Sequence, residues 1–494
     1  MKKYNQILSL TSLILLFFIS TGFCVPFENQ KPNIIFILAD DLGWADLPVY
    51  GNKFNEAPNL SKLAEEGIVF NNAYAACPVC SPTRASIMSG QYPARVGIID
   101  FIPGHWRPYE KVTVPINRTQ YLPEKIITVA EILKEAGYKT GYFGKWHLGR
   151  NKEHHPLNQG FDVANTGQGF YNSRFTPPRE QGKEKRFSER ITDFGIDFIE
   201  ENKDNPFFLF ISHFDVHVQL NADMDLINKY LEKGKVAGYP CNAIYAAMVE
   251  HIDRSIGRIE QKLADAGLAE NTVVVFFSDN GGLVQRFDKI PLIAKEKQYI
   301  YENSSLLYSA SSNLPLRGEK GSLYEGGIRE PMIVKWPGYV LPGSVSEVLV
   351  SSVDFLPTFA DLAGIDLPQT QVFDGVSLVD VFTGRKALHN RSVFWHYPVY
   401  HHDAPKSAVR KGEWKLIHNL VDDSYALYDL KNDIGEQADL SELFPDKKEE
   451  LVNILDKWRK DTGARLPEEN PNFDKNKRHE WGEHPDRKLF RVDK

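Results

Sequence analysis

The sequence predicts an α/β fold with a large, mostly parallel sheet flanked by helices, followed by a smaller C-terminal α+β subdomain. Five apolar runs recur along the chain, each followed by polar or glycine-rich residues: NIIFILADD, KTGYFGKWH, PFFLFISHFDVH, NTVVVFFSDNGG and EPMIVKWPG. Because the hydrophobicity of these runs is continuous rather than alternating, we expect strands that are buried on both faces. Helical patterns lie between the runs, which is the order of a parallel α/β sheet.

The helical patterns carry start and stop signals. Thr128 and Glu131 have the spacing of a capping box in front of an apolar stripe, and Gly137 follows as a stop. A longer amphipathic pattern covers residues 242–267 and is closed by Gly267. Both patterns fall between two apolar runs, where an α/β sheet needs its crossover helices.

The character of the chain changes after about residue 385. SAVRKGEWKLIHNL and SYALYDL have the pattern of short strands with turns, and DKKEELVNILDKWRKD follows with a helical pattern. We therefore place a larger domain at residues 25–384 and the C-terminal subdomain at residues 385–494. The Lys/Glu/Pro-rich segment after residue 466 is expected to be extended on the surface.

Residues 1–24 have the features of a secretory signal peptide. Met1, Lys2 and Lys3 precede the apolar run ILSLTSLILLFFIS, and small residues follow it. Because this run is too short to cross a membrane, we expect no stable membrane span. The signal-peptide pattern predicts an exported protein, periplasmic or secreted. Cys24 leaves open a lipid-anchored surface form, which the bulky Phe23 in front of it disfavours.

Composition limits the class of protein and of partner. The 494 residues are 42% apolar and 25% charged, as in ordinary globular proteins. A formal net charge of -7 argues against nucleic acid as the main partner, because phosphate binding needs a basic footprint. Beyond the leader only Cys77, Cys80 and Cys241 are left, too few for a disulfide framework. The hydrophobic core must therefore stabilise the fold.

Carboxylate and amide side chains follow two of the apolar runs. Asp40 and Asp41 come at the end of the first run, and Asp279 and Asn280 follow VVVFFS. Because ligands gather at the carboxyl ends of strands in α/β sheets, we expect these four residues to converge. Their oxygen atoms would form a hard-cation site for Ca²⁺ or Mg²⁺. Taken alone, each pair would more often be a helix cap or a solvated turn.

Cations and imidazoles follow the other runs and loops. A single residue of this kind is usually a surface charge or a satisfied structural group. Several of them beside a divalent cation indicate a pocket for a tetrahedral oxyanion, with donors for developing charge. The residues are Arg84, Lys145, His147, His213, His217 and Lys320.

Cys80 lies in CPVCSPTR, three residues after Cys77. A redox pair or half of a zinc site would leave Pro82, Thr83 and Arg84 without a role, and the chain has no second CxxC. A buried structural cysteine is the plainest alternative. A thiol beside an oxygen-ligated hard cation is, however, a mismatched ligand and nucleophile, and converting Cys80 into an oxygen nucleophile would remove the mismatch.

The stretch CSPTR, Cys80 to Arg84, resembles the CxPxR signature of the type I sulfatases in the alkaline phosphatase-like superfamily. In that family a maturase oxidises this cysteine to formylglycine (3-oxoalanine). Gly90 closes the longer pattern, and Ser89 is a mild departure from the commoner Thr or Ala. Other matching stretches are GYKTGYFGKWHLG, Asp40-Asp41, SDNGG, KGSLYEGGIREPMIVKWPG and AVRKGEWKLI. The resemblance spans nearly the whole mature chain, and it implies an alkaline phosphatase-like fold, a catalytic domain over residues 25–384 and hydrolysis of sulfuric esters.

The resemblance also implies roles for individual residues. Arg84 and Lys145 would hold the formylglycine hydrate, one hydroxyl of which attacks sulfur while Lys145 and Lys320 neutralise the oxygens. His217 is the candidate general acid for the leaving alcohol, and His147 would take a proton from the second hydroxyl. Calcium, or alternatively magnesium, would be bound by Asp40, Asp41, Asp279, Asn280 and the modified Cys80.

A secreted sulfatase with aromatic rim loops suits a sulfated carbohydrate, such as algal galactan, ulvan or glycosaminoglycan, better than a steroid or lipid. Candidate rim segments are FIPGHWRPYEK with His105, LVQRFDKIPLIAKEKQYIYENSS, and FWHYPVYHHD with His396, His401 and His402. Solvated loop charges are the alternative for the first two segments, and the alternatives for the histidines of the third are weak surface metal binding or no role. Two other functions stay open: a phosphonate monoester or phosphodiester hydrolase of the same superfamily, and a non-catalytic binder of sulfated glycans that keeps Cys80 as a thiol.

Overall fold

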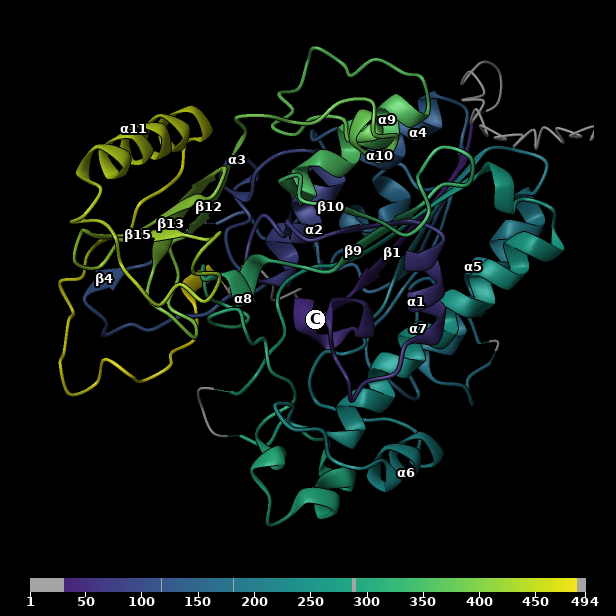
Figure 1. The fold of residues 1–494 in the computed structure, drawn as a ribbon, viewed down its shortest axis with the longest axis horizontal. Coiled ribbons are helices and arrows are strands. Elements are labelled where there is room, and N and C mark those ends of the chain that lie inside the picture. The colour runs from purple at the N-terminus through teal and green to yellow at the C-terminus, as the bar shows by residue number, and fades with distance from the viewer. Residues whose placement is uncertain (1–30, 117, 181, 287–289, 487–494) are drawn as a thin grey trace, which may run out of the picture.

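The computed structural model describes residues 31–116, 118–180, 182–286 and 290–486, so the predicted signal peptide lies outside the described residues. Within them, a large sheet contains β1 (Asn33–Ala39), β2 (Ile68–Phe70), β5 (Lys139–Gly144), β6 (Val163–Thr166), β7 (Phe207–Ser212), β8 (Thr272–Ser278), β9 (Met332–Lys335) and β10 (Ser344–Ser346). Their order across the sheet is β10-β2-β9-β8-β1-β7-β5-β6 (Figure 1).

Most of this sheet is parallel, which confirms the predicted fold class. Strand β1 pairs in parallel with β7 on one side and with β8 on the other, and β5 pairs in parallel with β7 and β6. Strand β9 runs antiparallel to both β8 and β2. Its direction could not be predicted from the sequence, because a strand that is buried on both faces is apolar whichever way it runs.

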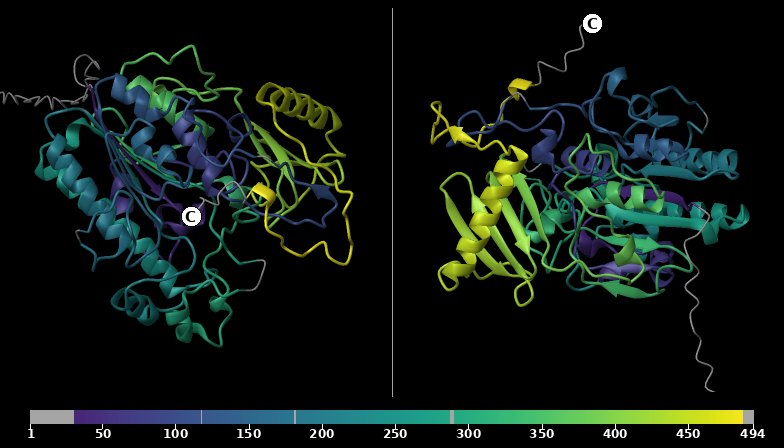
Figure 2. Two further views of the ribbon diagram at one scale, coloured as in Figure 1. Left: turned by 180° about the vertical axis from the view of Figure 1, so that it is seen from behind. Right: turned by 90° about the horizontal axis from the view of Figure 1, so that it is seen from above.

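The strands are apolar throughout because helices cover both faces of the sheet (Figures 1 and 2). Ile35 and Ile37 of β1 belong to the core on one face, which includes α1 (Pro58–Glu65), α5 (Phe187–Asn202) and α7 (Ala243–Asp265). The alternate residues Ile34, Phe36 and Leu38 belong to the other core, with α2 (Cys80–Ser89), α4 (Val129–Glu135), α9 (Phe355–Leu362) and α10 (Val379–Phe382). This double burial explains the continuous hydrophobicity of the runs.

The predicted helix signals are confirmed. Thr128 caps α4: its side chain accepts from the N–H of Glu131 at 3.2 Å, and the Glu131 carboxylate accepts from the N–H of Thr128 at 2.7 Å. Helix α7 ends just before Gly267, whose φ of 68° is one that glycine adopts readily. Of the helices in the described part of the chain, none combines the length and apolarity needed to cross a bilayer. Other elements are α3 (Pro93–Val96), α6 (Met224–Glu232), α8 (Glu325–Ile328), β3 (Ala73–Tyr74) and β11 (Val350–Ser351).

An antiparallel sheet forms the C-terminal subdomain (Figure 1). Its strands are β12 (Ser392–Tyr397), β13 (Lys406–Lys411), β14 (Trp414–Asn419) and β15 (Ser424–Asp429). Helix α11 (Pro445–Thr462) packs on this sheet through Leu451, Leu455 and Trp458. The indole N–H of Trp395 donates to the carbonyl of Ala75 in the large domain at 2.8 Å, so the two parts share a buried interface.

Up to Asp486, the segment after residue 466 lies on the surface with most of its residues exposed, as predicted, and it also packs along the large domain. Its strand β16 (Glu468–Glu469) pairs with β4 (Val112–Thr113). Arg118 is buried between two carboxylates, with Nη1 3.0 Å from Asp100 and Nε 3.3 Å from Asp486. Local composition could not predict this packing, because the segment's charged residues find their partners in a distant part of the chain.

Candidate active site

The four predicted metal ligands lie together at the carboxyl ends of two neighbouring strands. The last residue of β1 is paired with the last residue of β8, so the residues that follow the two strands meet at one edge of the sheet. The backbone N–H of Asp41 donates to Oδ1 of Asp279 at 3.2 Å, and Nδ2 of Asn280 donates to Oδ1 of Asp41 at 2.8 Å. The side chains of all four, Asp40 included, are buried.

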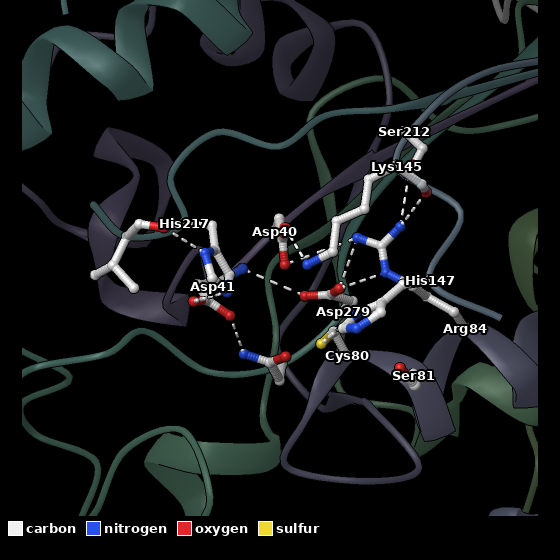
Figure 3. Close-up of polar contacts among 12 residues, drawn as sticks. Asp40, Asp41, Cys80, Ser81, Arg84, Lys145, His147, Ser212, His217 and Asp279 are labelled. Atoms are coloured by element: carbon white, nitrogen blue, oxygen red, sulfur yellow. Dashed lines mark hydrogen bonds and ion pairs between the residues drawn. The ribbon is translucent and has the colours of Figure 1, made fainter. Parts of the chain in front are cut away.

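Cys80 is the first residue of α2, a helix whose residues are all buried. Its Sγ and carboxylate oxygens of Asp40 and Asp279 lie within 4.8 Å of one another (Figure 3). Burial, partly offset by Lys145, raises the pKa of the Cys80 thiol. At neutral pH an unmodified Cys80 would therefore be a protonated thiol, which is a weak nucleophile.

Arg84, one turn along α2, connects the ends of three strands. Its Nε donates to Oδ2 of Asp279 at 2.8 Å. Its Nη1 donates to the carbonyl of Lys145, just after β5, and to the hydroxyl of Ser212 at the end of β7, both at 2.7 Å. The planar guanidinium group makes these contacts in different directions at once, which a lysine ammonium group cannot do. Arg84 therefore fixes the relative positions of the strand ends that carry the site.

Two lysines neutralise the other carboxylates. Nζ of Lys145 lies 2.5 Å from Asp40, and Nζ of Lys320 lies 2.6 and 2.7 Å from the two oxygens of Asp41. Burial alone would raise the pKa of Asp41, but Lys320, His217 and Lys145 together outweigh it and hold that pKa below its ordinary value. At Asp279, burial and the neighbouring Asp40 raise the pKa to about 6. A further cation between the carboxylates of Asp40 and Asp279 would relieve the repulsion between them.

The donor atoms of the site fit a divalent cation that prefers oxygen ligands. Oδ1 of Asp40 and Oδ1 of Asn280 are buried and accept no hydrogen bond within the described residues. Carboxylate and amide oxygens are the ligands that Ca²⁺ and Mg²⁺ take in proteins. The sulfur of Cys80 is a poor match for such an ion. Two sets of possible ligand atoms are each mutually within 4.8 Å: Asp40, Cys80 and Asp279, and Asp40, Asp41 and His217.

His147 presents one defined ring nitrogen to Cys80. Its Nε2 lies 2.8 Å from the carbonyl oxygen of Ile102, which can only accept, so Nε2 carries the ring proton. Its Nδ1 lies 3.1 Å from Sγ of Cys80 and therefore has a lone pair directed at that side chain. Burial, followed by Lys145, lowers the pKa of His147 well below its ordinary value and keeps the ring neutral. His147 can thus accept a proton from the side chain at position 80.

His217 approaches the site beside Asp41 (Figure 3). Its Nδ1 donates to the carbonyl of Val218 at 2.6 Å, and its Nε2 lies 3.7 Å from Oδ2 of Asp41. Burial and Lys320 lower the pKa of His217 to about 3, so the ring is neutral in this structure. To act as an acid, Nε2 needs a proton, which an anionic substrate nearby would stabilise.

A cavity of about 390 Å³ opens over these groups. It is lined by five of the predicted residues and three of the suggested rim histidines: Cys80, Lys145, His147, His217, Lys320, His105, His401 and His402. Two other histidines named in the sequence analysis do not line the cavity. His213 is buried elsewhere, and the ring of His396 contacts Ser407 and the carbonyl of Arg465. A larger groove of about 800 Å³ lies between the large domain and the C-terminal subdomain and contains none of the predicted site residues.

Comparison with known proteins assigns the chain to a family. The sequence profile of the sulfatase family matches residues 32–365, which is more than half of the chain. The profile of the N-sulphoglucosamine sulphohydrolase C-terminal region matches residues 318–460. The chain belongs to the sulfatase family. It is a sulfuric ester hydrolase, and the resemblance inferred from the sequence is confirmed.

Individual relatives of this sulfatase match over most of their length. A sulfatase of Formosa agariphila is 32% identical over 522 residues, covering 89% of this chain and 90% of that protein. The N-acetylgalactosamine-6-sulfatase of Sus scrofa is 34% identical over 409 residues, covering 78% and 72%. The crystal structure of Ps i-CgsB, also solved in complex with k-i-k-neocarrahexaose, has a TM-score of 0.73 and 27% identity, covering 90% of this chain and 95% of that one.

Some groups of the sulfatase site have no signature in the sequence. The carbonyls of Ile102 and Val218 set the ring tautomers of His147 and His217, but every residue has a carbonyl, so no residue type marks them. Ser212 ends an apolar run, yet its contact with Arg84 depends on strand order. The cavity lining also includes Phe101 and Arg286 from two of the suggested rim segments, and Arg150, Gln168 and Phe214, which the sequence analysis did not single out.

We expect Arg84→Lys to destabilise this sulfatase. A lysine could keep a contact with Asp279 but would lose the hydrogen bonds from Nη1 to the carbonyl of Lys145 and the hydroxyl of Ser212, and a hydrogen bond that involves a charged group contributes about 1.5–3 kcal/mol. The midpoint of thermal unfolding, followed by circular dichroism, should fall by several degrees. Arg179→Lys is the control, because Arg179 pairs with a half-exposed Asp197 and should matter little. Equal shifts in the two variants would contradict the role assigned to Arg84.

Proposed function

We propose that this sulfatase hydrolyses sulfate esters of carbohydrates with an oxygen nucleophile made from Cys80. The observation that carries the proposal is the Cys80 thiol itself, buried beside the carboxylates of Asp40 and Asp279 with a raised pKa. A protonated thiol is a weak nucleophile, and sulfur is a poor ligand for a hard cation. Oxidation of Cys80 to formylglycine, whose hydrate has two hydroxyl groups, would put oxygen in both roles.

This chemistry has consequences for how the protein is made. A formylglycine-generating maturase is the proposed partner, since the oxidation of Cys80 takes place after translation. We propose that residues 1–24 direct export to the periplasm or the exterior, that residues 25–384 form the catalytic domain, and that residues 385–494 form the C-terminal subdomain.

The proposed metal is Ca²⁺, with Mg²⁺ as the alternative. The buried Oδ1 atoms of Asp40 and Asn280, which accept no hydrogen bond from the described residues, support a cation at this position. When bound, the ion would draw negative charge from a sulfate oxygen and favour ionisation of a hydroxyl group at position 80. Its ligands would be Asp40, Asp41, Asp279, Asn280 and an oxygen of the modified Cys80.

The side chains around the cavity would bind the sulfate and move protons. Lys145 and Lys320 would hold sulfate oxygens and balance the charge that develops on them. Arg84 and Lys145 would keep the side chain of residue 80 in position. Nδ1 of His147 would accept a proton from that side chain, and Nε2 of His217 would donate one to the leaving alcohol.

The relatives and the cavity support a carbohydrate as the alcohol part of the ester. N-acetylgalactosamine-6-sulfatases are among the relatives, and a structural neighbour was solved with a carrageenan oligosaccharide. The cavity combines the aromatic rings of Phe101 and Phe214 with polar groups on histidines and arginines. A sugar ring has an apolar face and polar hydroxyl groups, so it matches both kinds of lining.

A parallel assay tests the reaction class. The purified enzyme is given 4-nitrophenyl sulfate and 4-nitrophenyl phenylphosphonate under the same conditions. It is then given a panel of defined sulfated saccharides that includes N-acetylgalactosamine 6-sulfate and carrageenan oligosaccharides, with released sulfate measured directly. We expect a higher kcat/KM for the sulfate than for the phosphonate, and sulfate release from at least one saccharide. A preference for the phosphonate would overturn the proposal.

Cys80→Ala should abolish turnover while the protein still folds. Loss of the nucleophile is expected to lower kcat at least about 10³-fold, whereas removing one sulfur atom should leave the core intact. Rates of sulfate release and circular dichroism spectra measure the two effects. Cys241→Ala is the control, since this buried cysteine does not line the cavity. Full activity in Cys80→Ala would exclude the proposed nucleophile. A wild-type protein that binds sulfated glycans without hydrolysing them, with the same binding in Cys80→Ala, would exclude it as well.

Asp279→Asn should remove the response to calcium. The substitution keeps the shape of the side chain but takes away one of the negative charges, and a ligand at 100 times its Kd stabilises by about 2.7 kcal/mol. We expect Ca²⁺ added after chelation to raise the thermal midpoint of the wild type and to have little effect on the variant. Asp253→Asn is the control, because this buried carboxylate contacts α1 instead and should leave the response intact. An undiminished calcium response in Asp279→Asn would refute the ligand assignment.

A further inference from the structure

The side chain of Asn313 lies where three loops of the site come together: the loops after β1 and β8, and the loop that carries Lys320. Its Nδ2 atom lies 2.9 Å from the carbonyl oxygen of Gly282 and 3.1 Å from those of Gly318 and Gly326. Since a carbonyl can only accept a hydrogen bond, the nitrogen of the amide group faces all three. Asn313 is 3% exposed, so water has little access to these contacts.

Two of these carbonyls are close in sequence to residues of the site. Gly282 comes two residues after Asn280, a predicted metal ligand, and Gly318 comes two residues before Lys320. The amide group of Asn313 therefore joins the loop of a metal ligand to the loop of a lysine that faces the sulfate pocket.

The oxygen of the same amide group faces the loop that follows β1. A Cβ atom at Gly43, two residues after Asp41, would lie 2.4 Å from Oδ1 of Asn313, and a Cβ atom at Gly282 would lie 2.9 Å from it. Both distances are too short for a side chain, so the close approach of these loops to Asn313 requires glycine at both positions. Asn313 thus fills the space between all three loops.

The loop of Lys320 depends on such support more than the other two loops do. The predicted metal ligands directly follow β1 and β8, so the sheet holds them in place. Lys320 lies instead in residues 310–324, which are described throughout and contain no helix or strand. Its backbone N–H reaches the carbonyl of Gly282 only at 3.3 Å, whereas Asn313 reaches the same carbonyl at 2.9 Å.

The chain just before Asn313 is itself fixed. The hydroxyl of Ser311 donates to the buried carboxylate of Asp46. That carboxylate also accepts from the N–H of Gly43 at 2.8 Å and from the hydroxyl of Tyr245, in α7, at 2.5 Å. Asn313 is therefore held against both the loop after β1 and a long helix, which allows it to fix the position of its neighbours.

We propose that Asn313 is a positioning residue, which acts through the backbone of Gly282 and Gly318 to hold Lys320 at Asp41. Nζ of Lys320 lies 2.6 and 2.7 Å from the two carboxylate oxygens of Asp41 in this arrangement. The inference rests on the proposed function, in which Lys320 holds a sulfate oxygen. Asn313 does not line the cavity, so its effect on the reaction has to pass through Lys320. A displacement of about 1 Å in an active site can cost about 10²-fold in rate.

A double-mutant cycle with Lys320 tests the proposal, with kcat for 4-nitrophenyl sulfate as the readout. We expect Asn313→Ala to lower kcat about 10- to 100-fold in the otherwise wild-type enzyme. In the Lys320→Ala background it should lower kcat less than about 3-fold, because a lysine that has been removed cannot be misplaced. Asn313→Ser keeps one hydrogen-bond donor and should retain more activity than Asn313→Ala. It takes the place of Asn313→Ala in the cycle if that variant does not fold.

Asn33→Ala is the matched control. Asn33, in β1, is also buried and also joins three segments, but at the opposite edge of the sheet. Its Nδ2 donates to Oγ1 of Thr272 at 3.4 Å, and its Oδ1 accepts from the N–H of Phe207 at 3.2 Å. Both substitutions should lower the midpoint of thermal unfolding, because each removes buried hydrogen bonds. Only the substitution of Asn313 should lower kcat.

The possible outcomes separate the positioning role from the proposed function. An unchanged kcat in Asn313→Ala refutes the positioning role. So does an equal loss of kcat with and without Lys320, or an equal loss in Asn33→Ala, since either result would mean that Asn313 only stabilises the fold. If Lys320→Ala keeps the wild-type kcat/KM, the role proposed for Lys320 fails and the positioning role fails with it.

Discussion

The active site depends on burying three carboxylates at one edge of a sheet without leaving their charges unpaired. Asp40, Asp41 and Asp279 are almost fully buried, and a buried carboxylate that lost its partner would cost several kcal/mol. The compensating cations come from helix α2, from the end of β5 and from the loop before α8: Arg84, Lys145 and Lys320. These groups meet because β8, β1, β7 and β5 are neighbours in the sheet. Position 80 lies where they converge.

The geometry around position 80 favours oxygen chemistry over sulfur chemistry. The Cys80 thiol is held next to oxygen ligands and to a neutral His147, whose proton is fixed on the far nitrogen by the carbonyl of Ile102. A hydroxyl group at this position would have a base beside it and lysines to balance its charge.

The sequence predicts the elements of this fold better than their partners. Continuous apolar runs identify the buried strands, and the Thr128 capping box and Gly267 mark helix ends, because these signals are local. The direction of β9, the packing of Arg118 between Asp100 and Asp486, and the contact between the rings of His105 and His401 depend on residues far apart in the chain. The candidate site could be predicted because its residues directly follow recognisable strands. The backbone carbonyls that orient its histidines could not, because every residue has a carbonyl group.

The identity of the side chain at position 80 is the central claim, and mass spectrometry of that peptide tests it most directly. A fully active preparation is digested, and the peptide that contains Cys80 is compared with the same peptide from a host that lacks the maturase. We predict the mass of formylglycine in the active enzyme and the mass of cysteine in the inactive one. A fully active enzyme in which every copy of the peptide carries unmodified cysteine would contradict the account.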